Sequence, residues 1–107
     1  MNEIAEEKNF ENKIKAYLKE QKCWFLKTWG GGYQRSGIPD LIICCNGYFI
    51  GLEVKASKGK ASELQEWNIG KIKQAGGIGL ILYPKDFEKF KELIIELKGG
   101  KNEVFTQ

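Results

Sequence analysis

The sequence predicts a single α/β (α+β) domain whose elements follow the order αβββαβα. Three observations support this fold class. Apolar residues recur with helical spacing in three segments, and short apolar runs of the kind that form strands lie between them. An Asn-Gly pair joins two of these runs, which is the strongest short-range signal of a β-hairpin. The 107 residues suffice for one compact core but not for two ordinary domains, so residues 1–107 are expected to form one unit.

The chain is expected to begin with an amphipathic helix over roughly residues 6 to 21. Apolar residues of this segment recur at i, i+4, i+7 and i+8, the spacing of one helix face: Phe10, Ile14, Tyr17 and Leu18. The next run, Cys23 to Trp29, is rich in aromatic residues and ends at three consecutive glycines, so it is expected to form the first strand.

Two further strands are expected on either side of Asn46-Gly47, over Asp40 to Cys45 and over Tyr48 to Lys55. A second helix is expected from about Ser62 to Ala75, because apolar residues line one side of this segment and Gly76-Gly77 follows as a stop.

The last two expected elements are a strand over Ile78 to Tyr83, ended by Pro84, and a helix that starts near Phe87 and ends at Gly99-Gly100. Residues 98–107 are expected to be a frayed tail, although Lys101 to Gln107 would also suit a further short strand.

Composition limits the classes of function. The net charge of +3 permits nucleic-acid binding without demanding it. No apolar run approaches the length of a membrane span, and the acidic N-terminus lacks the features of a secretory signal, so a cytoplasmic protein is expected. Cys23, Cys44 and Cys45 form no CxxC pair, and the chain has no histidine, so zinc is not expected and the thiols are interpreted as reduced and mostly buried.

The hairpin register brings acidic and basic side chains together. A two-residue turn at Asn46-Gly47 pairs Cys45 with Tyr48, and every further pair keeps the same position sum of 93. Because 40 and 53 also sum to 93, Asp40 and Glu53 are expected opposite each other on one sheet face. Lys55 projects from the same face, two residues beyond Glu53. An inserted β-bulge would break this arrangement.

Two facing carboxylates repel each other unless a proton or a cation lies between them. Oxygen ligands without histidine or thiolate favour Mg²⁺, with Mn²⁺ as a substitute, and such sites act on phosphodiesters. The alternative is that these charges only decorate a solvated strand face. Their position at the ends of apolar strands, with Asp40 beside Leu41-Ile42-Ile43, favours the metal site.

At these residues the sequence resembles the PD-(D/E)xK nuclease superfamily, through Pro39-Asp40 and Glu53-Val54-Lys55 on consecutive strands. It is also similar to the VRR-NUC (virus-type replication-repair nuclease) branch, especially its small stand-alone phage-type members, at these positions: Arg35 to Ile42, Gly51 to Lys55, Gly59, Ser62 and Gln65. The resemblance covers most of the chain. It implies a restriction-endonuclease-like core of αβββαβ order with an extra C-terminal helix, in which helices flank a central mixed sheet.

The resemblance implies that Asp40, Glu53 and the backbone carbonyl of Val54 bind the metal, and that Lys55 orients or deprotonates the attacking water. It implies a DNA nuclease of phage or bacterial replication and repair. Small members of this kind resemble Holliday-junction resolvases, so a homodimer that cuts branched DNA in a structure-directed way is expected. A catalytically silent nucleic-acid-binding or assembly module, and a nuclease acting on RNA or on nucleic-acid ends, are the alternatives.

Two further residues have competing interpretations. The resemblance places a metal-binding or catalytic glutamate on the first helix, which matches Glu11, although Glu7 projects nearer the centre of the apolar stripe and is its rival. Either glutamate would also suit a solvated first turn. Gln65 completes a capping box with Ser62, but the resemblance implies that it faces the substrate or the catalytic lysine.

Basic and hydroxyl side chains beside the expected site are candidates for contacts with DNA phosphates, with a solvated loop as the alternative. They are Lys27, Arg35, Ser36, Ser57, Lys58 and Lys60. Trp24, Trp29 and Trp67 each lie in or beside an apolar pattern, so they are expected in the core or at an interface rather than as base-stacking platforms. No segment resembles a base-reading recognition helix.

Overall fold

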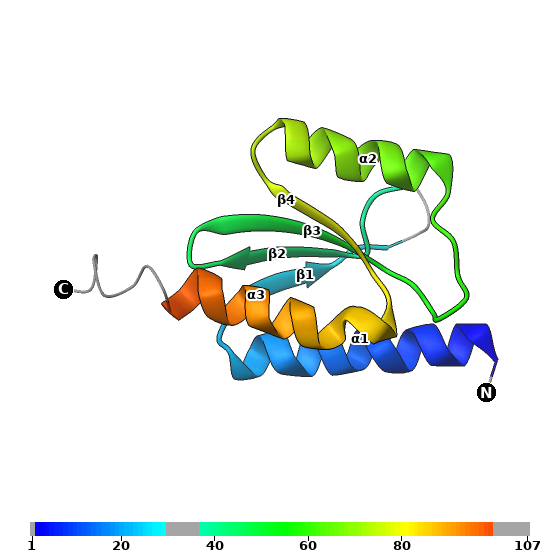
Figure 1. Cartoon of the computed structure of the whole chain (residues 1–107), viewed down its shortest axis with the longest axis horizontal. Coiled ribbons are helices and arrows are strands. Elements are labelled where there is room, and N and C mark those ends of the chain that lie inside the picture. The colour runs from blue at the N-terminus through cyan, green and yellow to red at the C-terminus, as the bar shows by residue number, and fades with distance from the viewer. Residues whose placement is uncertain (1, 30–36, 100–107) are drawn as a thin grey trace.

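A four-stranded sheet with the order β1-β2-β3-β4 forms the centre of the protein. The computed structural model describes residues 2–29 and 37–99 (Figure 1). Its elements are α1 (Glu3–Glu20), β1 (Trp24–Lys27), β2 (Leu41–Cys45), β3 (Tyr48–Val54), α2 (Glu63–Gln74), β4 (Ile78–Leu82), the 3₁₀ helix η1 (Pro84–Asp86) and α3 (Phe87–Gly99). The predicted order αβββαβα is therefore confirmed for these residues, whereas the expected tail beyond Gly99 lies outside them.

The sheet is mixed, because β1, β2 and β3 pair antiparallel and β3 and β4 pair parallel. The β2–β3 hairpin has the predicted register from Cys45↔Tyr48 to Leu41↔Leu52, with no bulge between them. The turn residues explain this register. Asn46 has a φ of 53° and Gly47 a φ of 86°, and two consecutive residues of positive φ favour a two-residue turn that matches the twist of the strands.

The helices cover the two faces of the sheet unequally. In Figure 1, α2 lies on one side of the sheet, and α1 and α3 lie together on the other. The main core is on the α1/α3 side, where fully buried residues of β2 and β3 meet apolar residues of both helices: Ile14, Leu18, Leu41, Ile43, Ile50, Leu52 and Ile94. Each helix thus buries one apolar stripe, and alternate strand positions supply the opposing surface.

Helix α2 lies close to the sheet because two strand positions lack side chains. A Cβ atom at Gly79 would lie 2.7 Å from the Ile69 backbone oxygen, and one at Gly51 would lie 2.4 Å from the tip of the Ile72 side chain. A side-chain tip can move aside, but a helix backbone can move only with the whole helix. Gly79 is therefore the position that fixes the distance between α2 and β4.

Replacing Gly79 by alanine is expected to lower the free energy of unfolding by about 1–3 kcal/mol, since the new methyl group overlaps the α2 backbone. Gly70→Ala is the matched control, because Gly70 lies within α2 and its added methyl group meets no atom within 4 Å. That variant is expected to gain about 0.5–1 kcal/mol from helix propensity. Urea unfolding measures both, and equal stability of the two variants would contradict this packing account.

Several elements differ from the sequence expectations at their boundaries, and one of them is β1, which runs from Trp24 to Lys27 rather than from Cys23 to Trp29. Helix α1 begins at Glu3 rather than near residue 6, because the Asn2 side chain accepts a hydrogen bond from the Ala5 backbone N–H and caps the helix.

Cys23 and Cys45 are buried free thiols, as expected, whereas Cys44 is exposed. Within the described part of the chain, no helix is long and apolar enough to cross a membrane.

Candidate active site

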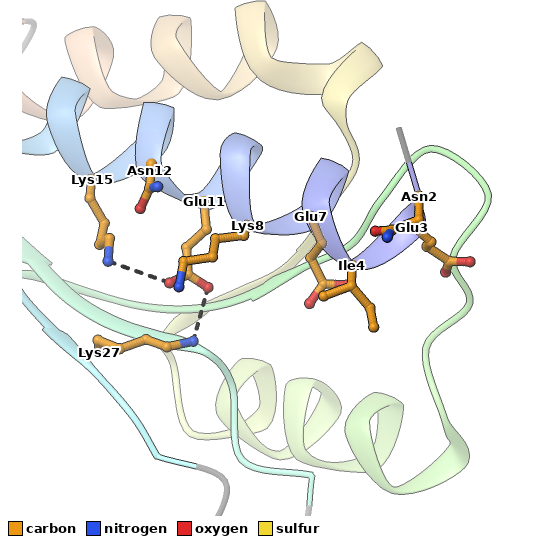
Figure 2. Close-up of a pocket in the computed structure, with 9 residues that line it drawn as sticks. All are labelled: Asn2, Glu3, Ile4, Glu7, Lys8, Glu11, Asn12, Lys15 and Lys27. Carbon is orange, nitrogen blue, oxygen red and sulfur yellow. Dashed lines mark hydrogen bonds and ion pairs between the residues drawn. The ribbon is translucent and has the colours of Figure 1, made fainter.

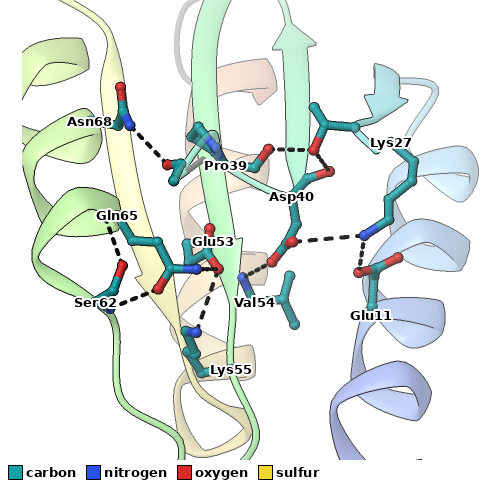
Figure 3. Close-up of polar contacts among 12 residues, drawn as sticks. Glu11, Lys27, Pro39, Asp40, Glu53, Val54, Lys55, Ser62, Gln65 and Asn68 are labelled. Carbon is teal, nitrogen blue, oxygen red and sulfur yellow. Dashed lines mark hydrogen bonds and ion pairs between the residues drawn. The ribbon is translucent and has the colours of Figure 1, made fainter. Parts of the chain in front are cut away.

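The predicted catalytic residues gather where β2 begins and β3 ends (Figure 3). Asp40 directly precedes β2, Glu53 and Val54 are the last residues of β3, and Lys55 follows them. Asp40 lies one position outside the strand in which it was expected, and its pairing with Glu53 is not part of the β ladder. The side chains nevertheless lie close together, because Asp40 Oδ2 accepts a hydrogen bond from the Val54 backbone N–H and the Asp40 charge acts on Glu53.

Hydrogen bonds from two neighbouring strands orient Asp40. Its carbonyl oxygen accepts a bond of 2.9 Å from the Thr28 backbone N–H, which extends the β1–β2 pairing one position beyond Lys27↔Leu41. The Asp40 carboxylate lies toward β3, where Oδ2 accepts a bond of 2.8 Å from the Val54 backbone N–H. The other oxygen, Oδ1, lies 3.7 Å from the Lys27 ammonium. One Asp40 oxygen therefore belongs to the fold, and the other points toward charged side chains.

Glu53 is a carboxylate in an apolar strand and is only 2% exposed. Its Oε2 accepts a hydrogen bond of 2.7 Å from Gln65 Nε2 and lies 3.6 Å from the Lys55 ammonium. Its Oε1 is buried and has no hydrogen-bond partner among the described residues. Burial and the negative charge of Asp40 raise the pKa of Glu53 to about 8, even though the Lys55 ammonium acts in the opposite direction.

This donor set suits a divalent cation of the Mg²⁺ class. Two carboxylates face each other, and one buried carboxylate oxygen lacks a partner, which costs free energy unless a cation or a proton compensates it. Among residues 2–29 and 37–99, no three Cys, His, Asp or Glu side chains lie close enough to hold a metal by themselves. A cation here would therefore rely on Asp40, Glu53, backbone oxygen and water, as Mg²⁺ typically does.

Gln65 forms the predicted capping box and also contacts the site, where its partner is Glu53 rather than the proposed catalytic lysine. Its Oε1 accepts a hydrogen bond of 2.8 Å from the Ser62 backbone N–H, while Ser62 Oγ accepts from the Gln65 N–H, which completes the capping box. Its Nε2 donates to Glu53. The cap of α2 and the orientation of the buried carboxylate are thus set by the same side chain.

Glu7 and Glu11 both line a hollow beside α1 that Lys27 also lines (Figure 2). Glu11 is 9% exposed and pairs with Lys27 at 2.9 Å and with Lys15 at 3.5 Å. Burial and the negative charge of Asp40 raise the pKa of Glu7, and the positive charge of Lys55 opposes this rise. Glu11 is the more buried of the two and pairs with Lys27, whereas the charges of Asp40 and Lys55 act on Glu7. Which of them is the acidic residue of the site therefore stays a prediction.

An open hollow of about 760 Å³ runs along α1 beside these charges. It is lined by acidic, basic and amide side chains, including Glu7, Glu11, Lys15 and Lys27 (Figure 2). Sequence reasoning assigned no role to Lys15 or Thr28, and it placed Lys27 only as a phosphate contact. Phe25 packs against the core, and Lys27, two residues later in β1, lies on the same face of the strand. This two-residue period could have predicted that Lys27 points toward α1.

The candidate phosphate-binding residues have different environments. Lys58 and Lys60 are both exposed in the loop that follows β3, as a phosphate contact requires. Ser57 Oγ donates a hydrogen bond to the Glu6 carboxylate, so the hydroxyl proton already has an acidic partner. Arg35 and Ser36 lie outside the described residues.

The expectation that the tryptophans lie in the core is wrong. Trp24 is 60% exposed, Trp29 is 79% exposed and Trp67 is 53% exposed. Trp24 lies on an edge strand, and Trp67 lies on a side of α2 that does not face the sheet, where Lys71 Nζ is 5.2 Å from its ring centroid. Whether these rings meet a partner stays a prediction.

The raised pKa of Glu53 predicts how stability depends on pH in metal-free buffer. Between its ordinary value of 4.5 and about 8, the folded protein holds a proton that the unfolded chain has released. The free energy of unfolding is therefore expected to fall as pH rises through this window, by up to about 1.4 kcal/mol per pH unit, and then to level off. Urea unfolding in EDTA at several pH values tests this, and stability that is flat between pH 5 and 8 would refute it.

Comparisons of the chain with protein-family models, with curated proteins and with solved structures gave no match. The functional assignment therefore rests on the arrangement of the site residues.

Proposed function

We propose that this protein is a metal-dependent DNA nuclease that hydrolyses phosphodiester bonds, and that it acts as a structure-directed endonuclease in DNA replication or repair. One observation carries the proposal: Glu53 is buried beside Asp40 with one oxygen unpartnered among the described residues, and Lys55 lies against its other oxygen. A fold gains no stability from two close carboxylates of which one is buried, so the arrangement is best explained by a cation and a phosphate group.

Asp40 and Glu53 would hold Mg²⁺ or Mn²⁺, and the resemblance to PD-(D/E)xK nucleases adds the backbone carbonyl of Val54. When bound, such a cation polarises the phosphoryl oxygens and lowers the pKa of a coordinated water. The Val54 N–H holds the Asp40 carboxylate in place, and the Gln65 amide does the same for Glu53. Both carboxylates are thus oriented before any ligand arrives, which reduces the reorganisation that catalysis requires.

Lys55 is the basic group placed to act on the substrate. Its side chain is 13% exposed, and its backbone N–H donates to the Leu82 carbonyl at 3.0 Å, so β4 fixes its position. From there the ammonium offsets the negative charge that develops on the phosphate and orients the attacking water. Glu11, or its rival Glu7, would add an acidic group from the α1 side of the site.

DNA is the proposed substrate, and shape rather than sequence would direct cutting. The exposed candidate phosphate contacts, Lys58 and Lys60, carry charge but read no base edge, whereas Lys27 is paired with Glu11 and Asp40. By the resemblance to resolvase-like nucleases, we further propose that a homodimer supplies two active sites to a branched duplex.

The test is cleavage of labelled linear, flapped, bubble and four-way-junction DNA, with single-stranded RNA of matched sequence beside them. Preferential Mg²⁺-dependent internal cutting of one branched DNA supports the proposal. Cutting of RNA alone would instead identify a ribonuclease, and removal of terminal nucleotides alone would identify a nuclease that acts on nucleic-acid ends. Binding of DNA without any cleavage would identify a catalytically silent nucleic-acid-binding module instead.

A further inference from the structure

Lys27 connects two acidic side chains that come from different elements. Its ammonium lies 2.9 Å from Glu11 Oε1 and 3.7 Å from Asp40 Oδ1 (Figure 3). Glu11 belongs to α1, Asp40 precedes β2, and Lys27 is the last residue of β1. One basic side chain thus closes the gap between the helix and the strand end that carries the proposed metal ligand.

The environment of Lys27 keeps it charged and directed inward. Its side chain is 43% exposed, whereas those of Glu11 and Asp40 are 12% and 23% exposed. Burial lowers the pKa of Lys27, but the hydrogen bond to Glu11 and the negative charges of Asp40, Glu11 and Glu7 outweigh burial and raise it. An ammonium therefore stands beside both acids at every physiological pH.

The two oxygens of Asp40 have different neighbours. Its Oδ2 is taken by the Val54 backbone N–H, a bond that belongs to the fold. Its Oδ1 is the oxygen that faces Lys27. A divalent cation bound by Oδ1 would lie close to the Lys27 ammonium, and two like charges at that distance repel each other.

We propose that Lys27 is an internal counter-ion of the site, which pairs with Asp40 and Glu11 in the metal-free protein and competes with a divalent cation for Asp40 Oδ1. The inference rests on the proposed metal-dependent function. Lys27 is then a positioning residue. Its positive charge reduces the repulsion between Glu11 and Asp40 until a bound cation neutralises them instead. The resulting site is stable without metal but binds metal more weakly than its carboxylates alone would.

The test is a Mn²⁺ titration of wild type, Lys27→Met and Lys27→Arg, in which the electron paramagnetic resonance signal of free Mn²⁺ measures the affinity. Lys27→Met keeps most of the length of the side chain but removes its charge, and it is expected to bind Mn²⁺ about three- to tenfold more tightly. Lys27→Arg keeps the charge and is expected to stay near the wild-type affinity. Lys15→Met is the matched control, because Lys15 pairs with Glu11 across one helix turn but not with Asp40.

A second readout is thermal unfolding. Without metal, Lys27→Met is expected to unfold about 2–6 °C below wild type, and saturating Mn²⁺ is expected to narrow this difference. A misfolded variant would lose affinity, so a gain in affinity together with lower metal-free stability distinguishes competition from damage.

Three outcomes overturn the inference. Unchanged or weaker Mn²⁺ binding by Lys27→Met would show that Lys27 does not compete with the cation, while the nuclease proposal would stand. An equal gain in Mn²⁺ affinity in Lys15→Met would show that the effect comes from the lower net charge and not from the position of Lys27. Absence of Mn²⁺ binding in wild type and Lys27→Met alike would overturn both this inference and the proposed metal-dependent function.

Discussion

Replacing Glu53 by glutamine is expected to abolish metal-dependent cleavage and, at the same time, to stabilise the metal-free protein above pH 8. Cleavage is expected to fall by at least about 1000-fold, because a neutral amide is a poor ligand for a hard cation. Stability is expected to rise by about 1–3 kcal/mol, because the amide avoids the cost of burying a charge that is 2% exposed and lies near Asp40.

The opposite signs of these two effects make the Glu53→Gln prediction specific. A residue that only supports the fold would lose activity through lost stability. Urea unfolding in EDTA at pH 8.5 and single-turnover cleavage in Mg²⁺ measure the two effects separately. Glu92→Gln, which makes the same change at an exposed position of α3, is the control and is expected to alter neither. A Glu53→Gln variant that is less stable and still cuts DNA would contradict the assignment.

Replacing Lys55 by alanine is expected to have the second-largest effect, a decrease in the rate of the chemical step of about 100- to 10,000-fold. Binding of Mn²⁺ and of DNA is expected to change far less, because the carboxylates remain in place and Lys55 is only 13% exposed to an approaching duplex. The backbone is also preserved, since the Lys55 N–H bond to the Leu82 carbonyl does not involve the side chain.

Single-turnover rates and Mn²⁺ affinity of Lys55→Ala together test this division of labour. Lys55→Arg tests whether charge alone suffices, and a partial recovery of rate is expected. The control is Lys89→Ala, an exposed lysine of α3 that has no role in the site. If Lys55→Ala cuts at the wild-type rate, Lys55 does not act on the substrate. If Lys55→Ala loses both cleavage and Mn²⁺ binding, Lys55 has a structural rather than a catalytic role.

The parts of the site that sequence could predict depend on local rules. The Asn46-Gly47 turn sets the hairpin register, and the register brings Glu53 and Lys55 toward the Asp40 side of the sheet. The α2 cap was equally predictable, because Ser62 and Gln65 form a capping box within one turn. These features require only neighbouring residues and the two-residue period of a strand.

The parts that sequence could not predict depend on packing between distant segments. The bond from the Thr28 N–H to the Asp40 carbonyl requires β1 to pair with β2 in one register, and no local pattern around Asp40 predicts that register. The ion pair of Lys27 with Glu11 requires β1 to lie beside α1 in a particular orientation. Trp67 lies in an apolar-looking helical pattern, but the side of α2 that carries it does not face the sheet. Periodicity identifies apolar positions without showing which of them another element will cover.

The measurement that tests the central claim most directly is cleavage of a labelled four-way junction and its linear arms in Mg²⁺, Mn²⁺ or EDTA, comparing wild type with Asp40→Ala. The wild-type protein is expected to cut in either metal and to stop in EDTA. Asp40→Ala is expected to bind the junction and leave it intact under all three conditions. Cutting that survives EDTA, or that persists in Asp40→Ala, would contradict the assignment of this site to metal-dependent phosphodiester hydrolysis.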